Sequence, residues 1–393
     1  MEPQMSVYAE LRSYIQMISV AVSLPSPSDA STRLTIAADG VAIRVSHRGD
    51  TRHLRLPAKA ALGVTSIPVQ KQGVTTVEWR LPLSPDDTSQ DSTAEDGTSL
   101  WSAMDLEVES GVGCRNCGAS IINTSSVAWK DLPSENWAEM MDFWHCHKPA
   151  DHGHSHGHTD AGKADEASLA ARGYGASSTI SAQKGIGFVD LTTMLFSEND
   201  CHGLTFSIST FDQGSTSRED MVETKSQSLN IFCSSCQIQL GFFNLRAAAV
   251  TLLKWQVSCK SASGILPNVS ECLAATISST ISRSGSAKSI VVPVAGSPEK
   301  ADQVIHIWVL LSRGIVYSSS TIEGSIPALR LFYRLISQEE ADRMLEGMIC
   351  DAQEINLPVT AIKQVIHHLE ESNKLLPGSE RIFKNWKVGL LKR

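Results

Sequence analysis

Two Cys-x-x-Cys pairs, Cys114/Cys117 and Cys233/Cys236, are the residues of this chain best suited to metal chemistry. Two thiolates two residues apart can hold one tetrahedral ion from a tight turn, and two such pairs complete a four-sulfur structural zinc site. Both pairs occur in strand–turn–strand contexts, CRNCGAS and FCSSCQIQLG, whereas a redox pair begins a helix in a thioredoxin-like unit. We therefore predict a structural Zn²⁺ ion held by all four cysteines.

The alternative is two separate metal sites, because over a hundred residues separate the two pairs. The residues that would complete such sites are His145, Cys146, His147, Cys201 and His202. We favour the shared site because equivalent knuckles commonly face each other in ribbon-like sites, and sharing would clamp two distant β regions together. The remaining cysteines, Cys259, Cys272 and Cys350, have no neighbouring His or acidic pattern, which predicts buried structural thiols.

Between the two pairs lies LPSENWAEMMDFWHCHKP, Leu132 to Pro149, which ends in three consecutive metal-ligand residues. Ser134 can cap a helix, and that helix would carry aromatic and thioether side chains over two turns. One interpretation makes this face ordinary core. The other makes the helix a platform that presents soft and imidazole ligands at its tip.

The elements that must position these residues are mostly antiparallel strands. TRLTIAADGVAIRVS alternates apolar and polar residues around Asp39-Gly40, a two-residue hairpin signal. Ser337 with Glu340 predicts a capped helix near the C-terminus, and LPVTAIKQVIHHLEESN has helical periodicity. The prediction is an α+β fold, predominantly antiparallel β in two β-rich regions joined by a disordered linker and stapled by a four-cysteine zinc site, with two C-terminal helices.

Composition divides the chain and excludes some functions. We expect an N-terminal β-rich region over 1–149, a linker over 150–184 that is rich in His, Gly, Ala and Ser, and a C-terminal β-rich region over 185–393. The net charge is −8 and no block of Lys or Arg stands out, so direct nucleic-acid binding is not expected. No apolar run approaches the roughly 20 residues that cross a membrane, so no membrane partner is expected.

The order CRNCG, LPSENWAEMMDFWHCH, FVDLTTMLF, FCSSCQIQLG and LLKWQV resembles the HECT-like ubiquitin-conjugating-enzyme-binding protein family, as a fungal-type member. The resemblance runs from about Val7 to the C-terminus, and its most specific piece is LPSENW with the following Trp-His-Cys-His cluster. It implies a ubiquitin-protein ligase of the nucleus and cytoplasm that receives ubiquitin from a conjugating enzyme, so that both proteins are partners. It also implies a link to the metallo-β-lactamase-type endonuclease of pre-mRNA 3′-end processing.

In that second role, the resemblance assigns the segment Leu132 to Pro149 to the nuclease contact. A Cys or His at a helix tip can reach a partner's open zinc position. Cys146 is the predicted metal-touching residue, with His145 and His147 as helpers and Trp137 and Trp144 as aromatic anchors.

The chain departs from a HECT-type ligase at one position. Such a ligase needs a cysteine that forms a thioester with ubiquitin, and the family carries it after Leu-Pro and Thr near the C-terminus. Here the corresponding stretch is Leu357-Pro358-Val359-Thr360-Ala361, and alanine cannot carry an acyl group. Two hypotheses follow: a ligase or ligase-like adaptor for a conjugating enzyme, and a non-enzymatic partner or chaperone of the nuclease.

Overall fold

The computed structural model describes residues 4–61, 66–85, 100–107, 110–122, 127–132, 182–207, 228–245, 247–294, 301–310, 314–347 and 351–393. The chain forms two compact units: unit 1 comprises Met1–Thr98 and Val269–Arg393, and unit 2 comprises Ser99–Asn268. This division differs from the regions expected from the sequence, because β1 (Ser6–Arg12) pairs with β20 (Ile315–Ser319) and so joins the two ends of the chain in one sheet. The predicted linker over 150–184 lies outside the described residues up to 181, so its disorder stays a prediction.

Unit 1 is built on a ten-stranded sheet in the order β22-β18-β19-β21-β20-β1-β2-β7, with β24 on β21 and β23 on β24. Its other strands are β2 (Met17–Ser23), β7 (Thr76–Pro82), β18 (Lys288–Pro293), β19 (Val304–Trp308), β21 (Ile326–Ile336), β22 (Ala352–Leu357), β23 (Ile382–Phe383) and β24 (Trp386–Lys392). Only β18 and β22 pair in parallel; the other pairs in this sheet are antiparallel.

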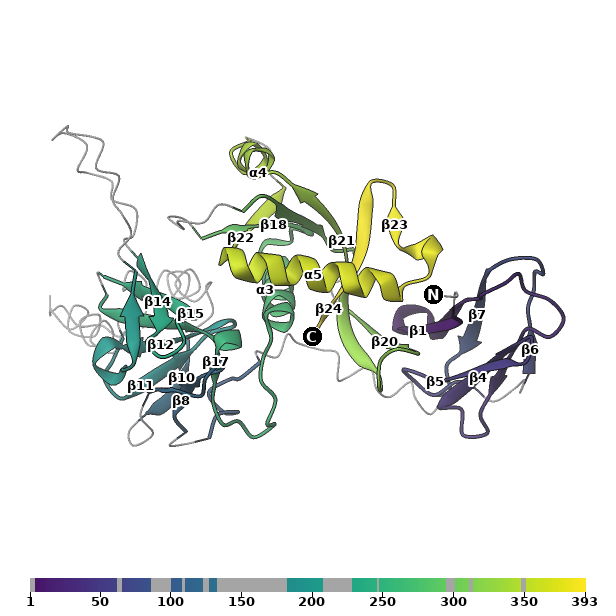
Figure 1. Cartoon of the computed structure of the whole chain (residues 1–393), viewed down its shortest axis with the longest axis horizontal. Helices are drawn as coiled ribbons and strands as arrows, with labels where there is room; N and C mark the ends of the chain where they lie inside the picture. The colour runs from purple at the N-terminus through teal and green to yellow at the C-terminus, as the bar shows by residue number, and fades with distance from the viewer. Residues whose placement is uncertain are drawn as a thin grey trace, which may run out of the picture. The chain divides into compact units, whose positions relative to one another are not determined.

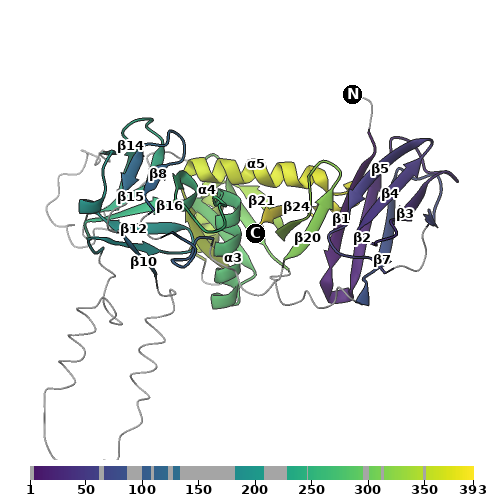
Figure 2. The same cartoon turned by 90° about the horizontal axis from the view of Figure 1, so that it is seen from below.

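A second sheet of unit 1 has the order β5-β4-β3-β6, and Figure 2 shows it beside β1, β2 and β7. Its strands are β3 (Arg33–Ile36), β4 (Ala42–His47), β5 (Asp50–Arg55) and β6 (Ser66–Pro68). The apolar residues that alternate along β3 and β4 pack against those of β1, β2 and β7 in one buried cluster. The hairpin predicted at Asp39-Gly40 is present, with Gly40 at φ 75° in the turn.

Three α-helices occur within the described residues, α3 (Val269–Ser284), α4 (Gln338–Leu345) and α5 (Val359–Leu375), and all lie in unit 1. The two C-terminal helices were predicted: the Ser337 side chain accepts the Glu340 N–H at the start of α4. The prediction of two helices missed α3, because its sequence VSECLAATISSTISRS is rich in residues that favour strands and turns. Thr276 and Ser278 satisfy their hydroxyls on carbonyls one turn earlier, which lets these residues remain helical.

Helix α5 crosses the sheet over β24 and β18 (Figure 1) and also contacts β19. Helix α3 contacts both α5 and β24. The close approach depends on Gly389 in β24, where an added Cβ would lie 2.6 Å from the Leu369 side chain of α5. No helix in the part of the chain that the structure describes is long and apolar enough to span a bilayer.

Unit 2 contains a seven-stranded sheet in the order β10-β11-β12-β16-β15-β14-β13 and a three-stranded sheet in the order β17-β8-β9. Their strands are β8 (Val112–Cys114), β9 (Ser120–Ile122), β10 (Ala128–Asp131), β11 (Ile186–Val189), β12 (Thr193–Ser197), β13 (Leu204–Phe206), β14 (Ser228–Cys233), β15 (Gln239–Asn244), β16 (Ala249–Leu253) and β17 (Val257–Ser258). One buried cluster joins both sheets and includes Cys114 and Cys233. The core of unit 2 therefore extends directly to the cysteine pairs, and the predominantly antiparallel β architecture is as predicted.

Candidate metal centre and partner-binding cleft

The four paired cysteines come together in unit 2. All four Sγ atoms lie within 4.8 Å of one another. Two contacts join the pairs crosswise, Cys114 Sγ to Cys236 Sγ at 3.6 Å and Cys117 Sγ to Cys233 Sγ at 3.6 Å. Four sulfurs bound at about 2.3 Å to a tetrahedral ion stand roughly 3.8 Å apart, so the observed spacing fits such an ion.

The two knuckles have the same backbone geometry. The Cys114 N–H donates to the Ala119 carbonyl and the Gly118 N–H donates to the Cys114 carbonyl, each at 2.8 Å. In the second knuckle the Cys233 N–H donates to Ile238 and the Gln237 N–H donates to Cys233. Gly118 and Gln237 occupy equivalent positions, and both have positive φ, at 74° and 58°. Each β-hairpin turn therefore presents its two thiols to the same point from opposite sides.

Hydrogen bonds at one of the thiols, Cys236, favour the thiolate form that a metal needs. The Asn116 side chain of one knuckle and the Ile238 N–H of the other lower the pKa of Cys236 to about 6. Burial acts in the opposite direction at Cys114 and raises its pKa to about 12. A buried thiolate beside three others requires a cation to offset its charge, so this group could hold a metal ion.

Strand β9 and the chain from Cys201 to Leu204 hold the knuckles together. Ile122 forms a bridge with Cys201, and the His202 N–H donates to the Ile121 carbonyl at 2.9 Å. Leu204 then pairs with Cys233 at the other knuckle. The segment from Cys201 to Leu204 thus links the hairpin β8–β9 to the hairpin β14–β15.

Neither Cys201 nor His202 joins the metal-binding group found among the described residues. The Cys201 Sγ donates instead to the Ser197 carbonyl at 3.4 Å, and burial together with Asp200 and Glu198 raises its pKa to about 12. Two of the residues offered to complete separate sites are therefore placed elsewhere. The other three, with Trp137 and Trp144, lie outside the described residues, so the roles predicted for these five residues remain predictions: His145, Cys146, His147, Trp137 and Trp144.

The position predicted to correspond to the HECT-like cysteine is buried. Strand β22 ends at Leu357, Pro358 precedes α5, and Ala361 lies in the first turn of that helix with 2% of its surface exposed. Elsewhere in the described chain, Cys259 and Cys272 are buried, and burial raises the pKa of Cys259. No described cysteine outside the four-cysteine group therefore combines exposure with a lowered pKa, as an acyl acceptor requires.

Sequence reasoning missed a cleft in unit 1. It is lined by the β1–β2 turn, the end of β19, the start of β20 and the outer face of β21, including Tyr14, Leu310 and Phe332. Glu10 and Arg330 form its charged floor. These segments come from both ends of the chain, so no local motif could have indicated the cleft.

Some of the exposed apolar side chains of unit 1 lie at this cleft. Within the described residues, the exposed large apolar side chains of unit 1 are Tyr14, Ile15, Leu310, Ile382 and Phe383. Tyr14 and Leu310 line the cleft, and Phe383 packs on Phe332 with ring centroids 5.2 Å apart. A grouping of this kind is a mark of a protein-binding surface, because isolated exposed apolar residues are otherwise scattered.

Comparisons with known proteins agree with the sequence resemblance. A family model described as HECT-like ubiquitin-conjugating enzyme (E2)-binding matches residues 10–388. An uncharacterized protein of Schizosaccharomyces pombe is 26% identical over 300 residues, which cover 74% of this chain and 76% of that protein. An uncharacterized protein of Saccharomyces cerevisiae is 22% identical over 292 residues, or 73% of this chain and 71% of that protein. No solved structure matches the chain significantly. Because the family model covers nearly the whole length, the chain belongs to the HECT-like ubiquitin-conjugating enzyme (E2)-binding family.

Proposed function

We propose that this protein binds a ubiquitin-conjugating enzyme through the cleft of unit 1 and assists ubiquitin transfer in the nucleus and cytoplasm without itself carrying ubiquitin. The observation that supports this proposal is the gathering of exposed apolar side chains around Tyr14, Leu310 and Phe332 in a member of an E2-binding family. Large apolar and aromatic anchors that enter or line a pocket supply most of the affinity of protein interfaces. Under this proposal ubiquitin arrives attached to the conjugating enzyme.

The lack of a suitable acceptor cysteine among the described residues supports a scaffold over a covalent ligase. Ala361 has no thiol, and its position in the first turn of α5 is buried. The four-cysteine group has a structural role in this proposal: its soft thiolate donors and tetrahedral spacing suit a Zn²⁺ ion. Zinc would fix the knuckles of unit 2 and take no part in ubiquitin chemistry.

The variants Tyr14→Asp and Leu310→Asp test the docking surface. Both side chains are mostly exposed, at 66% and 56%, so the substitutions place a charge on the surface without emptying the core. We expect each to weaken binding to the cognate member of a panel of purified, ubiquitin-charged conjugating enzymes by on the order of tenfold. Isothermal titration calorimetry would measure the affinity. Met104→Asp, at a 92% exposed apolar position in unit 2, is the matched control and should leave the affinity unchanged.

The same reactions should be run on gels with and without dithiothreitol. We expect no thiol-sensitive ubiquitin adduct on the wild-type protein, and none on Ala361→Cys, because a thiol at that position would be buried. A dithiothreitol-sensitive adduct on the wild-type chain would refute the scaffold proposal. Equal affinity of Leu310→Asp and Met104→Asp would refute the assignment of the cleft.

A second candidate function is a non-enzymatic partner or chaperone of the pre-mRNA 3′-end-processing endonuclease. The same Ala361 supports it, since a binding protein needs no acceptor thiol. The segment that would engage the nuclease follows Leu132, whose N–H donates to Val189 at 2.7 Å, at the β10 edge of the seven-stranded sheet.

For this candidate, we expect Cys146→Ala to abolish co-purification of the endonuclease, while zinc content and conjugating-enzyme affinity stay at wild-type values. Cys201→Ala is the matched control, because Cys201 lies outside the four-cysteine group. The measurement is the amount of nuclease recovered with tagged full-length protein. Full recovery with both Cys146→Ala and Trp144→Ala would rule out the proposed contact.

A further inference from the structure

The outer face of the four-stranded sheet in unit 1 has no role in the cleft or the metal centre. The inner face of this sheet packs into the core through residues such as Leu34, Ile43, Val45 and Leu54. Because side chains alternate along a strand, the residues between them point to the opposite face. That face is turned to solvent, so core packing does not dictate which residue types occupy it.

Three arginines cross this face, one on each of three neighbouring strands: Arg33 on β3, Arg44 on β4 and Arg55 on β5. Arg33 is opposite Ser46, two residues from Arg44. Arg44 is opposite His53, two residues from Arg55. Each arginine is thus one strand across and two residues along from the next, a spacing of roughly 8 Å.

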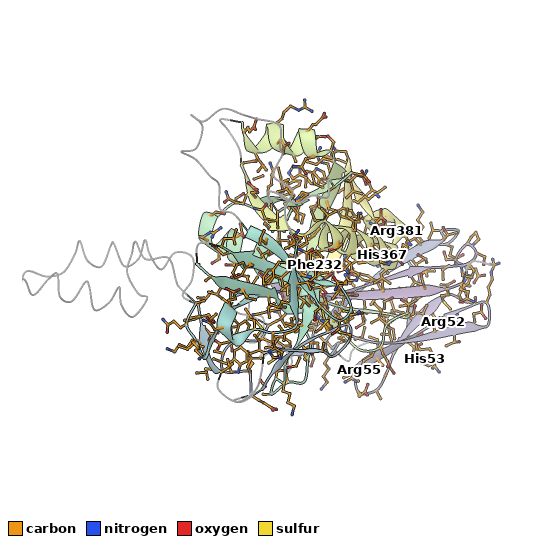
Figure 3. The ribbon with its side chains drawn as sticks, turned by 60° about the vertical axis from the view of Figure 1, so that its left-hand side comes forward. Arg52, His53, Arg55, Phe232, His367 and Arg381 are labelled. Atoms are coloured by element: carbon orange, nitrogen blue, oxygen red, sulfur yellow. The ribbon has the colours of Figure 1, made fainter. Side chains whose placement is uncertain are left out.

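We call Arg33, Arg44 and Arg55 the arginine stripe. All three are exposed, and His53 beside Arg44 is exposed as well. Figure 3 shows Arg52, His53 and Arg55 following one another along β5 at the margin of the sheet. The stripe places three full positive charges on one surface of a chain whose net charge is −8.

No acidic side chain in the part of the chain that the structure describes neutralises the stripe. Among the described residues no carboxylate forms an ion pair with any of its arginines; the ion pair of this sheet is Arg48 with Asp29 at 2.7 Å. Asp39 and Asp50 stand at the two hairpin turns, and Asp39 accepts the N–H of Val41 within its own turn. Apart from His53, the other outward residues of β3, β4 and β5 are hydroxyl-bearing or small: Thr35, Ala42, Ser46 and Thr51.

Protection of a sheet edge does not account for the stripe. Charged residues on an edge strand discourage pairing with other chains, which would explain Arg55 on β5. The strands β4 and β3 are internal, each with a neighbour on both sides. Arg33 and Arg44 therefore serve no edge, and a recognition role explains all three positions together.

We propose that the arginine stripe binds an extended acidic protein segment. Guanidinium groups form paired hydrogen bonds with carboxylates, and alternate side chains of an extended peptide stand roughly 7 Å apart, close to the spacing of the stripe. Single-stranded nucleic acid is the less suitable occupant, because His53 is the one aromatic side chain among the outward residues of β3, β4 and β5, and successive bases need a series of rings to stack on. The proposal is independent of conjugating-enzyme binding at the cleft.

Fluorescence anisotropy with the full-length protein tests the proposal. The probes are a labelled peptide of alternating Glu and Gly, the same peptide with Gln for Glu, and an oligouridine of equal length. We expect the Glu peptide to bind best, and the triple variant Arg33→Gln/Arg44→Gln/Arg55→Gln to weaken it by on the order of tenfold. The affinity should also fall on raising the salt from about 50 mM to about 200 mM.

The matched control removes the same number of positive charges from exposed positions elsewhere in unit 1, as Arg80→Gln/Arg343→Gln/Lys363→Gln. It should leave the affinity within about twofold of wild type. Equal binding of the Glu and Gln peptides, equal loss in both triple variants, or tighter binding of oligouridine would each overturn the proposal. Thermal melting of both variants verifies the fold, and the single reversal Arg44→Glu provides a second test if the stripe triple variant is unstable.

Discussion

Cys114→Ser is expected to abolish zinc binding by the four-cysteine group and to lower the stability of unit 2 by at least about 3 kcal/mol. The reason is the position of the cysteines: Cys114 and Cys233 belong to the buried core, and the group joins two hairpins that are otherwise distant in sequence. Without an ion, the remaining thiolates would repel one another in a partly buried place. Zinc content by plasma mass spectrometry and amide hydrogen exchange measure the two effects.

The control for this prediction is Cys201→Ser, which changes a neighbouring thiol outside the group and retains a hydroxyl donor to the Ser197 carbonyl. It should keep about one zinc per chain, whereas Cys114→Ser should hold about none. Exchange should rise in β14 and β15 of unit 2 and stay unchanged in β24 of unit 1. Unchanged zinc content in Cys114→Ser would show that the group is not a metal site.

The four-cysteine group was accessible from sequence because the information for each knuckle is local. Each knuckle needs only a short turn between two strands, and the spacing of Cys233 and Cys236 already fixes that turn. The partnership of the two pairs is a tertiary fact. The approach of the two pairs depends on β9 and on the segment from Cys201 to Leu204, which connect the two hairpins through backbone pairing. Backbone pairing of this kind does not require particular residue types, so the sequence does not reveal it.

The cleft and the arginine stripe could not be predicted for the same reason. The cleft joins Tyr14 with Leu310, and the stripe depends on the register that aligns Arg44 with His53. Residues eleven positions apart, such as Arg33 and Arg44, form no block of charge in the sequence. The absence of a run of Lys or Arg in the sequence therefore showed only that no continuous basic segment exists. Arginines from separate strands still form a basic surface in the fold.

Arg330→Met is expected to destabilise unit 1 by about 3–5 kcal/mol. The Arg330 guanidinium bridges Glu10 of β1 and Glu380 near the C-terminal end, with its second contact at 2.7 Å. The Glu10 side chain is only 5% exposed and also accepts the Tyr8 hydroxyl at 2.9 Å. Removing the arginine would leave this buried carboxylate with a single, longer ion-pair contact, to Arg12 at 3.6 Å. Urea denaturation measures the change in the free energy of unfolding.

A matched control separates burial from charge pairing itself. Arg48→Met breaks the Arg48–Asp29 pair, in which both side chains are largely exposed, and should cost at most about 1 kcal/mol. The double variant Glu10→Gln/Arg330→Met removes the stranded charge, so it should be more stable than Arg330→Met alone. If Arg330→Met lowers the free energy of unfolding by no more than Arg48→Met does, the buried Glu10–Arg330 pair does not hold β1 to the C-terminal part of unit 1. The strand pairing of β1 with β20 would then carry that role without help from charge.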